Sequence, residues 1–133
     1  MNIRRVSSDQ VTEPPPGTWS NCLVVGDQIF IAGMTARSQD FDTVGESGEY
    51  AQAKAIFRKI QALVEQAGGT MADIVKVNIF VTDISRREEV WRARKEVFTG
   101  DFPVSTLVEV SALALPEMVV EVEAVGFIGA GKR

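Results

Sequence analysis

The stretch from Tyr50 to Ala67 carries the pattern that most constrains the fold, an apolar stripe at helical spacing. Steps of three or one residues separate its apolar positions, which are Ala53, Ile56, Phe57, Ile60, Leu63, Val64 and Ala67. These positions share one face of an α-helix, and Gly68-Gly69 supplies a C-terminal stop. Such an amphipathic helix needs a second layer that covers its apolar face.

Further segments predict that second layer. Apolar runs bounded by turn residues predict strands at residues 23–25, 29–32, 74–82, 105–111 and 119–128. A second amphipathic helix is expected over residues 90–98, before Gly100. The order β-β-α-β-α-β-β predicts an α+β two-layer sandwich, in which both helices cover one face of a mainly antiparallel or mixed sheet. Association between copies is the expected cover for the other face.

Short polar motifs predict where the two helices begin. Thr43 with Glu46, and Ser85 with Glu88, have the spacing of a capping box. The polar residues 35–48, broken by glycine, predict a loop that is long enough to be functional or mobile.

The chain, residues 1–133, is expected to form one domain. The Pro14–Pro16 run excludes helix and central strand, so residues 1–16 are predicted to be an extended N-terminal segment. Residues 129–133 are predicted to be a tail. The first residues do not resemble a signal peptide, and no segment approaches the roughly 18 apolar residues of a membrane span. We therefore expect a soluble, cytoplasmic protein without membrane partners.

Composition excludes several kinds of chemistry. The chain has no histidine, so it cannot form a Ser-His-Asp triad, a Cys-His dyad or an imidazole-ligated zinc site. Its one cysteine, Cys22, is predicted to be a small buried apolar residue rather than a nucleophile. Eighteen acidic residues against fourteen basic ones give a net charge of −4, which disfavours nucleic acid as a partner.

Several stretches, read in order, resemble a known family. They are Gly-Thr-Trp-Ser at 17–20, Ile-Phe-Ile-Ala-Gly-Met at 29–34, Ala-Gly at 67–68, the strand at 75–83, Phe-Pro-Val-Ser at 102–105 and the strand at 119–125. From about residue 17 to about residue 128, the chain resembles the reactive intermediate deaminase family, also called the Rid, YjgF or L-PSP endoribonuclease-like family.

The resemblance implies a chorismate-mutase-like fold. It also implies a homotrimer whose sheets form an inner barrel, with ligand clefts between neighbouring subunits. Deaminating members hydrolyse enamine or imine products of pyridoxal-phosphate enzymes and use no cofactor of their own. In them an arginine after Pro-Ala binds the substrate carboxylate, and a glutamate on the last strand orients the attacking water.

Carried over position by position, the resemblance assigns a short set of polar site residues. Glu121 matches the glutamate and is the expected catalytic residue, and Gly33 matches a glycine of the second predicted strand. Ser105 stands where the family has the arginine, and backbone groups near Ser105 and Thr106 are expected to bind the substrate oxygen. A serine offers one neutral hydroxyl in place of a bidentate guanidinium. We therefore expect poor turnover of 2-aminoacrylate-type enamines.

Other carried-over positions make the expected cleft broader and more apolar. These substrate-binding positions are Trp19, Ala32, Met34 and Trp91. Trp91 also falls on the apolar face of the second predicted helix, where packing in the core is the alternative role. The expected ligand is a small, relatively apolar metabolite bound between subunits.

The charged candidates keep alternative interpretations. Glu121 is either a partly desolvated base or an exposed strand residue, and burial together with Glu123 would raise its pKa. Glu109 is expected on a neighbouring strand, but no metal-ligand motif supports a metal site among these carboxylates. Arg37, in the loop at 35–48, is a candidate replacement for the arginine missing at position 105.

Basic residues cluster around the second predicted helix at Arg86, Arg87, Arg92, Arg94 and Lys95. They predict either an RNA-phosphate site or, as we favour, a solvated face with pairs such as Glu88–Arg92. Arg94 also falls on the apolar face of this helix.

Three functions remain open: an imine or enamine hydrolase, a non-catalytic small-molecule sensor or accessory protein, and an endoribonuclease or translation inhibitor. The negative net charge disfavours the third.

Overall fold

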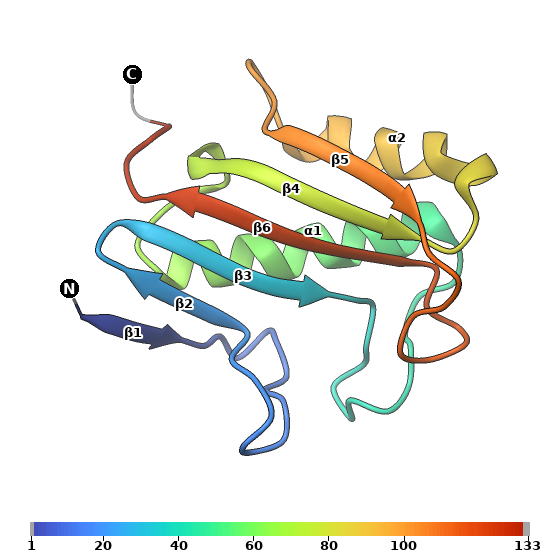
Figure 1. The fold of residues 1–133 in the computed structure, drawn as a ribbon, viewed down its shortest axis with the longest axis horizontal. Helices are drawn as coiled ribbons and strands as arrows, with labels where there is room; N and C mark the ends of the chain where they lie inside the picture. The colour runs from blue at the N-terminus through green and yellow to red at the C-terminus, as the bar shows by residue number, and fades with distance from the viewer. Residues whose placement is uncertain (1, 132–133) are drawn as a thin grey trace.

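The computed structural model describes residues 2–131. Within them, six strands form one mixed sheet in the order β1-β2-β3-β6-β4-β5. The strands are β1 (Ile3–Val6), β2 (Cys22–Val25), β3 (Gln28–Met34), β4 (Ile74–Val81), β5 (Val104–Glu109) and β6 (Val120–Phe127). The helices are α1 (Glu49–Gln66) and α2 (Arg87–Val97), with 3-10 turns η1 (Met71–Asp73) and η2 (Ile84–Arg86). Both helices lie on the same side of the sheet (Figure 1), so the predicted α+β sandwich is confirmed.

The N-terminal segment departs from the predicted element order. The prediction lacks β1, which pairs antiparallel with β2 at the edge of the sheet. Four residues with two adjacent arginines give too short a pattern to predict a strand, and backbone pairing with β2 creates it. Residue 1 of the predicted N-terminal segment and residues 132–133 of the predicted tail lie outside the described residues. Before them, the Gly131 N–H donates to Asp73 at 2.8 Å, which docks this part of the tail on η1.

Neither helix begins at its predicted capping box. α1 begins after Gly48, and the Thr43 hydroxyl instead donates to Asp40 within the preceding loop. Ser85 donates through its backbone N–H and its hydroxyl to Asp83, which caps η2, and α2 begins only at Arg87. Short polar side chains bond readily to nearby groups, so in both places they stabilise a turn instead of the helix start.

The helix-facing side of the sheet holds the core. Strand alternation directs Ile29, Val77, Ile79 and Val122 toward the helices, and all four are fully buried. α1 packs across β3 and β6 and also contacts α2. Full burial of one such side chain contributes about 1.5–3 kcal/mol to folding, so this face accounts for much of the stability.

The opposite face of the sheet is the uncovered face. No helix lies over it in Figure 1. Its apolar side chains include Phe30 and Phe127, each 41% exposed, and Val104 on β5, which is 66% exposed. The uncovered apolar face predicted from the element order is therefore present, within the described residues.

A crossover places β5 beneath α2. β4 and β5 are parallel, so the chain must return along the sheet between them, and α2 makes that return. The register pairs Val77 with Ser105 and Asn78 with Thr106. Because Val77 faces the core, Ser105 lies on the helix side of the sheet and Thr106 on the uncovered face.

Candidate functional site

Glu121 lies on the uncovered face, on the central strand β6, against Gly33 of β3. The β3–β6 register is interrupted between Ile31 and Met34, so Ala32 and Gly33 form an irregularity in the ladder. A Cβ at position 33 would collide with the Glu121 carboxylate. Glycine therefore leaves the space that this carboxylate occupies, and the structure brings the two predicted site residues together.

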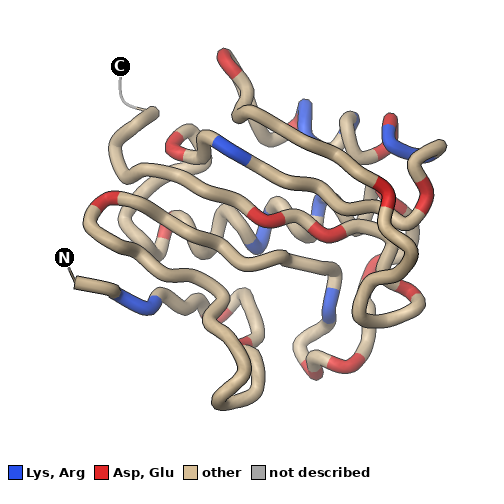
Figure 2. The backbone as a smooth tube through the Cα atoms, in the orientation of Figure 1, with Lys and Arg blue, Asp and Glu red and all other residues tan. Residues whose placement is uncertain are grey.

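The surroundings of Glu121 raise the pKa of its carboxyl group above the usual value. Burial is the largest cause, and the like charge of Glu123 adds to it, while Arg37 acts in the opposite direction. The two acidic positions of β6 are neighbours on the central strand in Figure 2. Glu123 accepts a hydrogen bond from the Asn78 side chain at 3.3 Å. A partly desolvated carboxylate binds a proton more readily and is suited to accept and return one during hydrolysis.

A small cavity lies beside Gly33, where β3 ends. Its lining combines aromatic and basic side chains and includes Trp19, Gly33, Met34, Arg37, Phe41 and Lys59. The Trp19 and Phe41 rings are 5.8 Å apart between centroids, and the Arg37 guanidinium carbon lies 3.9 Å from the Phe41 centroid. The indole N–H of Trp19 donates to Asn21 at 3.3 Å, which orients the ring. Trp19 is 44% exposed, so it presents a flat surface at the mouth of the cavity.

Of two further predicted substrate-binding residues, Met34 lines this cavity and Ala32 lines a neighbouring pocket with Phe30, Asn78 and Glu123. Ala32 is half buried, and its backbone N–H donates to the Asn21 carbonyl at 2.9 Å. Met34 belongs to the buried core and reaches the cavity only from beneath. Ala32 therefore shapes the uncovered face, whereas Met34 mainly supports the strand that carries Gly33.

Arg37 reaches the Trp19 cavity but does not reach Ser105. Its guanidinium donates to the Phe41 carbonyl at 2.7 Å, and Phe41 has a backbone φ of 73°, unusual for a residue with a side chain. Lys59 donates to the carbonyls of Thr35 and Arg37, and burial lowers the pKa of its ammonium group. Both cations are thus held by carbonyl oxygens around the loop that follows β3.

Ser105 has a guanidinium as its neighbour. Nη1 of Arg94 donates to the Ser105 hydroxyl at 2.9 Å. The premise that no guanidinium lies at this position is therefore wrong, since the crossover brings one from α2. Spacing along the sequence had placed Arg94 both on the apolar face of the helix and in its basic cluster, and neither pattern identified its contact with β5.

Trp91 is half buried on α2. The buried residues of this helix are Val90 and Ala93, so packing of Trp91 in the core is wrong as the alternative role. Its ring centroid lies 5.6 Å from the Arg87 guanidinium carbon and 5.9 Å from that of Arg94. Trp91 therefore forms an aromatic surface beside the Arg94–Ser105 pair.

Two other basic residues near α2 are paired with acids. Arg92 binds Glu89 at 2.9 Å, so the expected Glu88–Arg92 pair is replaced by one three residues apart. Arg86 binds the buried carboxylate of Glu49 at 2.9 Å. These two pairs agree with the interpretation of a solvated helix face with interleaved acids.

One chain does not bring all the predicted site residues together. Glu121, Gly33 and Trp19 lie around the uncovered face and its edge, whereas Ser105 and Arg94 lie on the helix side. Strand β4 separates β6 from β5, which places the two strands roughly 10 Å apart. A small molecule that touches both Glu121 and Ser105 of one chain would have to pass through the sheet or around its β5 edge.

The remaining candidate groups have structural roles. Cys22 is buried, as predicted, and burial raises the pKa of its thiol to about 11, which makes it a poor nucleophile. Glu109 accepts the Ile84 backbone N–H at 2.9 Å and so fixes the start of η2. Within residues 2–131, no group of three or more histidine, cysteine, aspartate or glutamate side chains is arranged so that it could bind a metal ion. Neither described helix has the length and apolar character needed to cross a membrane.

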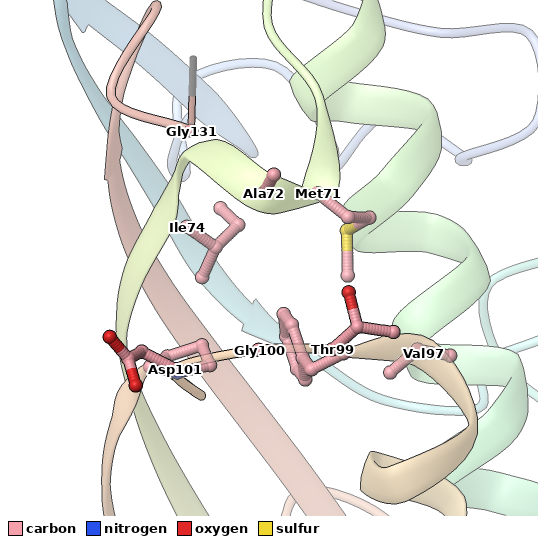
Figure 3. Close-up of a pocket in the computed structure, with 10 residues that line it drawn as sticks. Met71, Ala72, Ile74, Val97, Thr99, Gly100, Asp101 and Gly131 are labelled. Carbon is pink, nitrogen blue, oxygen red and sulfur yellow. The ribbon is translucent and has the colours of Figure 1, made fainter. Parts of the chain in front are cut away.

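A separate pocket lies between η1 and the segment after α2 (Figure 3). Its lining includes Met71, Ile74, Phe98 and Thr99, and Asp101 is the one ionisable side chain among its lining residues. None of the residues at either candidate region lines it. The pocket therefore lies apart from the chemistry of Glu121 and Arg94.

The model of the endoribonuclease L-PSP family matches residues 11–128. The chain belongs to this family. It is 31% identical to a 2-iminobutanoate/2-iminopropanoate deaminase from Dermatophagoides farinae, over 85% of this chain and 88% of that protein.

Solved structures of other proteins share the fold. RidA from the Antarctic bacterium Psychrobacter sp. PAMC 21119 is 30% identical, with a TM-score of 0.84 over 94% of this chain and 99% of that one. A Pseudomonas aeruginosa protein of unknown function is 36% identical, with a TM-score of 0.85 over 96% of this chain and 93% of that one. The family and the fold predicted from the sequence are confirmed.

Proposed function

We propose that this L-PSP family member binds a small metabolite between copies of itself and hydrolyses an imine or enamine there. One observation carries the proposal, the half-buried carboxylate of Glu121 held over Gly33 on the uncovered face. The deaminase activity named for the Dermatophagoides relative supports this reaction class. No cofactor is required, because water is the co-reactant.

Hydrolysis of an imine adds water across the C=N bond and then releases ammonia. Glu121 accepts a proton from the attacking water as the C–O bond forms and returns it to the nitrogen, which gives a carbinolamine. Glu121 then accepts the hydroxyl proton of the carbinolamine as the carbonyl forms and passes it to the nitrogen as the C–N bond breaks, which leaves a carbonyl product and ammonia. The raised pKa of the Glu121 carboxyl makes the carboxylate a better proton acceptor than an exposed glutamate.

A second copy completes the cleft in this proposal. The uncovered face carries Phe30, Phe127 and Val104 in exposed positions, and large exposed apolar patches on single chains are uncommon. Packing copies through this face into a trimer would bring Glu121 of one chain near the β5 edge of the next. The separation of Glu121 from Ser105 within one chain supports this arrangement.

The proposed substrate has a larger apolar body than a three-carbon enamine. Trp19 and Trp91 provide broad aromatic surfaces at the two halves of the cleft, and Ala32 adds a small apolar wall. Flat or branched apolar groups would gain most from these surfaces. Enamines of the 2-aminoacrylate type fill less of this space and are proposed to be poor substrates.

Ammonia release tests the proposal. Imines are generated in the assay by an amino acid oxidase from alanine, 2-aminobutanoate, leucine and phenylalanine. We expect the wild-type protein to accelerate ammonia release most for the larger imines, and Glu121→Ala to abolish that acceleration. If the wild-type protein binds the corresponding 2-oxo acids but accelerates none of these reactions, it is a sensor and the hydrolase proposal is wrong.

No structural observation favours RNA as the substrate. Arg86 and Arg92 are neutralised by Glu49 and Glu89, and the net charge of the chain is −4. Cleavage of a single-stranded RNA by the purified wild-type protein, lost in Glu121→Ala, would reverse this preference.

A further inference from the structure

A basic hollow lies between the loop after β3 and the middle of α1, beside the Trp19 cavity. Its volume is about 380 Å³, and its lining includes Gln10, Arg37, Ser38, Glu46, Arg58 and Lys59. Three cations and one acid give this lining a formal charge of +2, whereas the whole chain carries −4. Neither Trp19 nor Gly33 lines the hollow, so it is distinct from the Trp19 cavity, although the two share Arg37 and Lys59.

Regular structure fixes both walls of the basic hollow. On α1, Arg58 and Lys59 follow Ala55 by three and four residues, so all three share one helix face, to which Ala55 contributes only a methyl group. The other wall is the loop after β3, which folds back so that Arg37 forms an antiparallel bridge with Val44. The cations therefore extend from two backbone segments whose positions are set by hydrogen bonds.

Two of the three cations are held in place by neutral groups. The Arg37 guanidinium donates to the Phe41 carbonyl at 2.7 Å, and the Lys59 ammonium donates to two backbone carbonyls at 2.6 and 2.8 Å. Arg58 is exposed, and none of the three cations forms an ion pair within residues 2–131. The carbonyls orient these groups without neutralising them, and each group keeps further N–H donors for a ligand. Because two of the side chains are already ordered, an anion would bind at a smaller entropic cost.

The positive charges of the hollow also destabilise one another. Burial is the largest cause of the lowered pKa of the Lys59 ammonium group; Glu46 opposes the lowering, and the like charge of Arg37 adds to it. Arg37 and Lys59 therefore lie within each other's field, and Glu46 forms an ion pair with neither. An anion in the hollow would offset both the lost hydration and the repulsion, so it would gain more there than at an isolated exposed lysine.

The donors of the lining favour phosphate over a carboxylate. Two guanidinium groups, one ammonium group and the Ser38 hydroxyl come from two different elements, and a phosphate group has enough oxygens to accept from all of them. A carboxylate has only two oxygens and one charge, whereas a phosphate monoester carries close to two negative charges at neutral pH and matches the charge of +2. The net charge of −4 disfavours a long polyanion as the ligand.

We propose that the basic hollow binds a phosphate dianion, free or carried by a small metabolite, through Arg37, Arg58 and Lys59. The Ser38 hydroxyl adds a neutral donor, and Glu46 is the acid in the lining that limits the affinity. The proposal is independent of the hydrolase proposal, because Arg58 takes no part in the reaction at Glu121.

Phosphorus NMR titration of the full-length protein at constant ionic strength tests this site. The probes are inorganic phosphate and glycerol 3-phosphate, with acetate as a competitor of lower charge. We expect Arg58→Ala to weaken phosphate binding about 10-fold, as for one charge-assisted bond. Glu46→Gln should tighten binding about 3- to 10-fold, because it removes a charge of the same sign as the ligand. Lys95→Ala removes one exposed cation from α2 and is the matched control, which should leave the affinity unchanged.

Every outcome of the titration decides a part of the proposal. No saturable binding of phosphate or glycerol 3-phosphate by the wild-type protein overturns it. Equal losses in Arg58→Ala and Lys95→Ala overturn it too, because a general attraction to surface charge would produce them. Unchanged or weaker binding in Glu46→Gln contradicts the position of the ligand, and displacement of phosphate by equimolar acetate contradicts the assignment of a dianion. Tighter binding of glycerol 3-phosphate than of phosphate supports a phosphorylated metabolite, and the reverse order supports free phosphate.

Discussion

Glu121 and Arg94 are both partly buried charged groups, and burial is the main cause of the pKa shift of each. They differ in position and in the charged groups that lie near them. Glu121 lies on the central strand of the uncovered face, beside the like charge of Glu123 and within the field of Arg37. Arg94 extends from α2 toward the edge strand on the other side of the sheet, where it donates to the neutral hydroxyl of Ser105.

This difference shows how one chain can hold two incomplete halves of a site. A carboxylate and a guanidinium that faced each other would form an ion pair, and neither group would then be free to bind a ligand. Here the sheet keeps Glu121 and Arg94 apart, so each retains the energetic cost of an unpaired charge. A substrate with a carboxylate and an imine carbon could use both charges only where two copies meet, which supports the proposed cleft.

The largest expected effect is a kinetic separation of the two groups. Glu121→Gln should lower kcat about 10²- to 10⁴-fold and change KM little, because it removes the proton acceptor. Arg94→Ala should instead raise KM about 10- to 100-fold with a small change in kcat, because it removes the guanidinium beside Ser105 that would bind a substrate carboxylate. Steady-state ammonia release with the leucine-derived imine measures both constants. If the two variants change the same constant to the same extent, the division of roles is wrong.

The second prediction concerns the space that Gly33 leaves for Glu121. Gly33→Ala should cost about 1–3 kcal/mol of unfolding free energy, because its methyl group competes with the carboxylate. The displaced carboxylate should also lower turnover, since small misplacements of reacting groups are costly. Urea unfolding and the ammonia assay measure the two effects. Gly45→Ala is the control, because its Cβ would lie an ordinary 3.4 Å from the Ser38 hydroxyl; an equal cost at both positions would contradict the prediction.

The smallest effect is a pH dependence of stability at Glu121. Its pKa is raised in the folded state, so the ionised carboxylate destabilises the fold above that pKa, and the cost disappears as pH falls below the ordinary value of 4.5. Glu121→Gln should therefore stabilise the protein at pH 8 by less than about 1 kcal/mol, and the gain should vanish near pH 4. Urea unfolding at both pH values checks the sign. Glu88→Gln, at an exposed position on α2, should show no such gain; a loss of stability in Glu121→Gln at pH 8 would contradict the assignment.

Local patterns predicted most of the fold. The α1 stripe, the alternating β4 and the crossover helix α2 all follow from spacing, because these elements bury one face each. The strand β1 and the starts of both helices did not follow, since backbone pairing and turn hydrogen bonds decide them. A capping-box spacing is a weak signal where the same hydroxyl can bond within a loop.

In the candidate site, too, some features followed from the sequence and others did not. Glu121 and Glu123 are two residues apart on one strand, so their shared face and the direction of the Glu121 pKa shift could be predicted. Arg94 could not be placed, because its contact with Ser105 depends on how α2 lies over β5. An arginine within an otherwise apolar stripe was the one available signal.

The sequence alone determined the α1 stripe, the alternation of β4 and the family that the chain resembles, because side-chain periodicity acts over a few neighbouring residues. Only the tertiary structure decided that the Glu121 carboxylate occupies the space at Gly33 and that Arg94 meets Ser105. Those contacts join residues from different strands and helices. Their geometry is set by sheet register and by the crossover, which depend on packing across the whole chain.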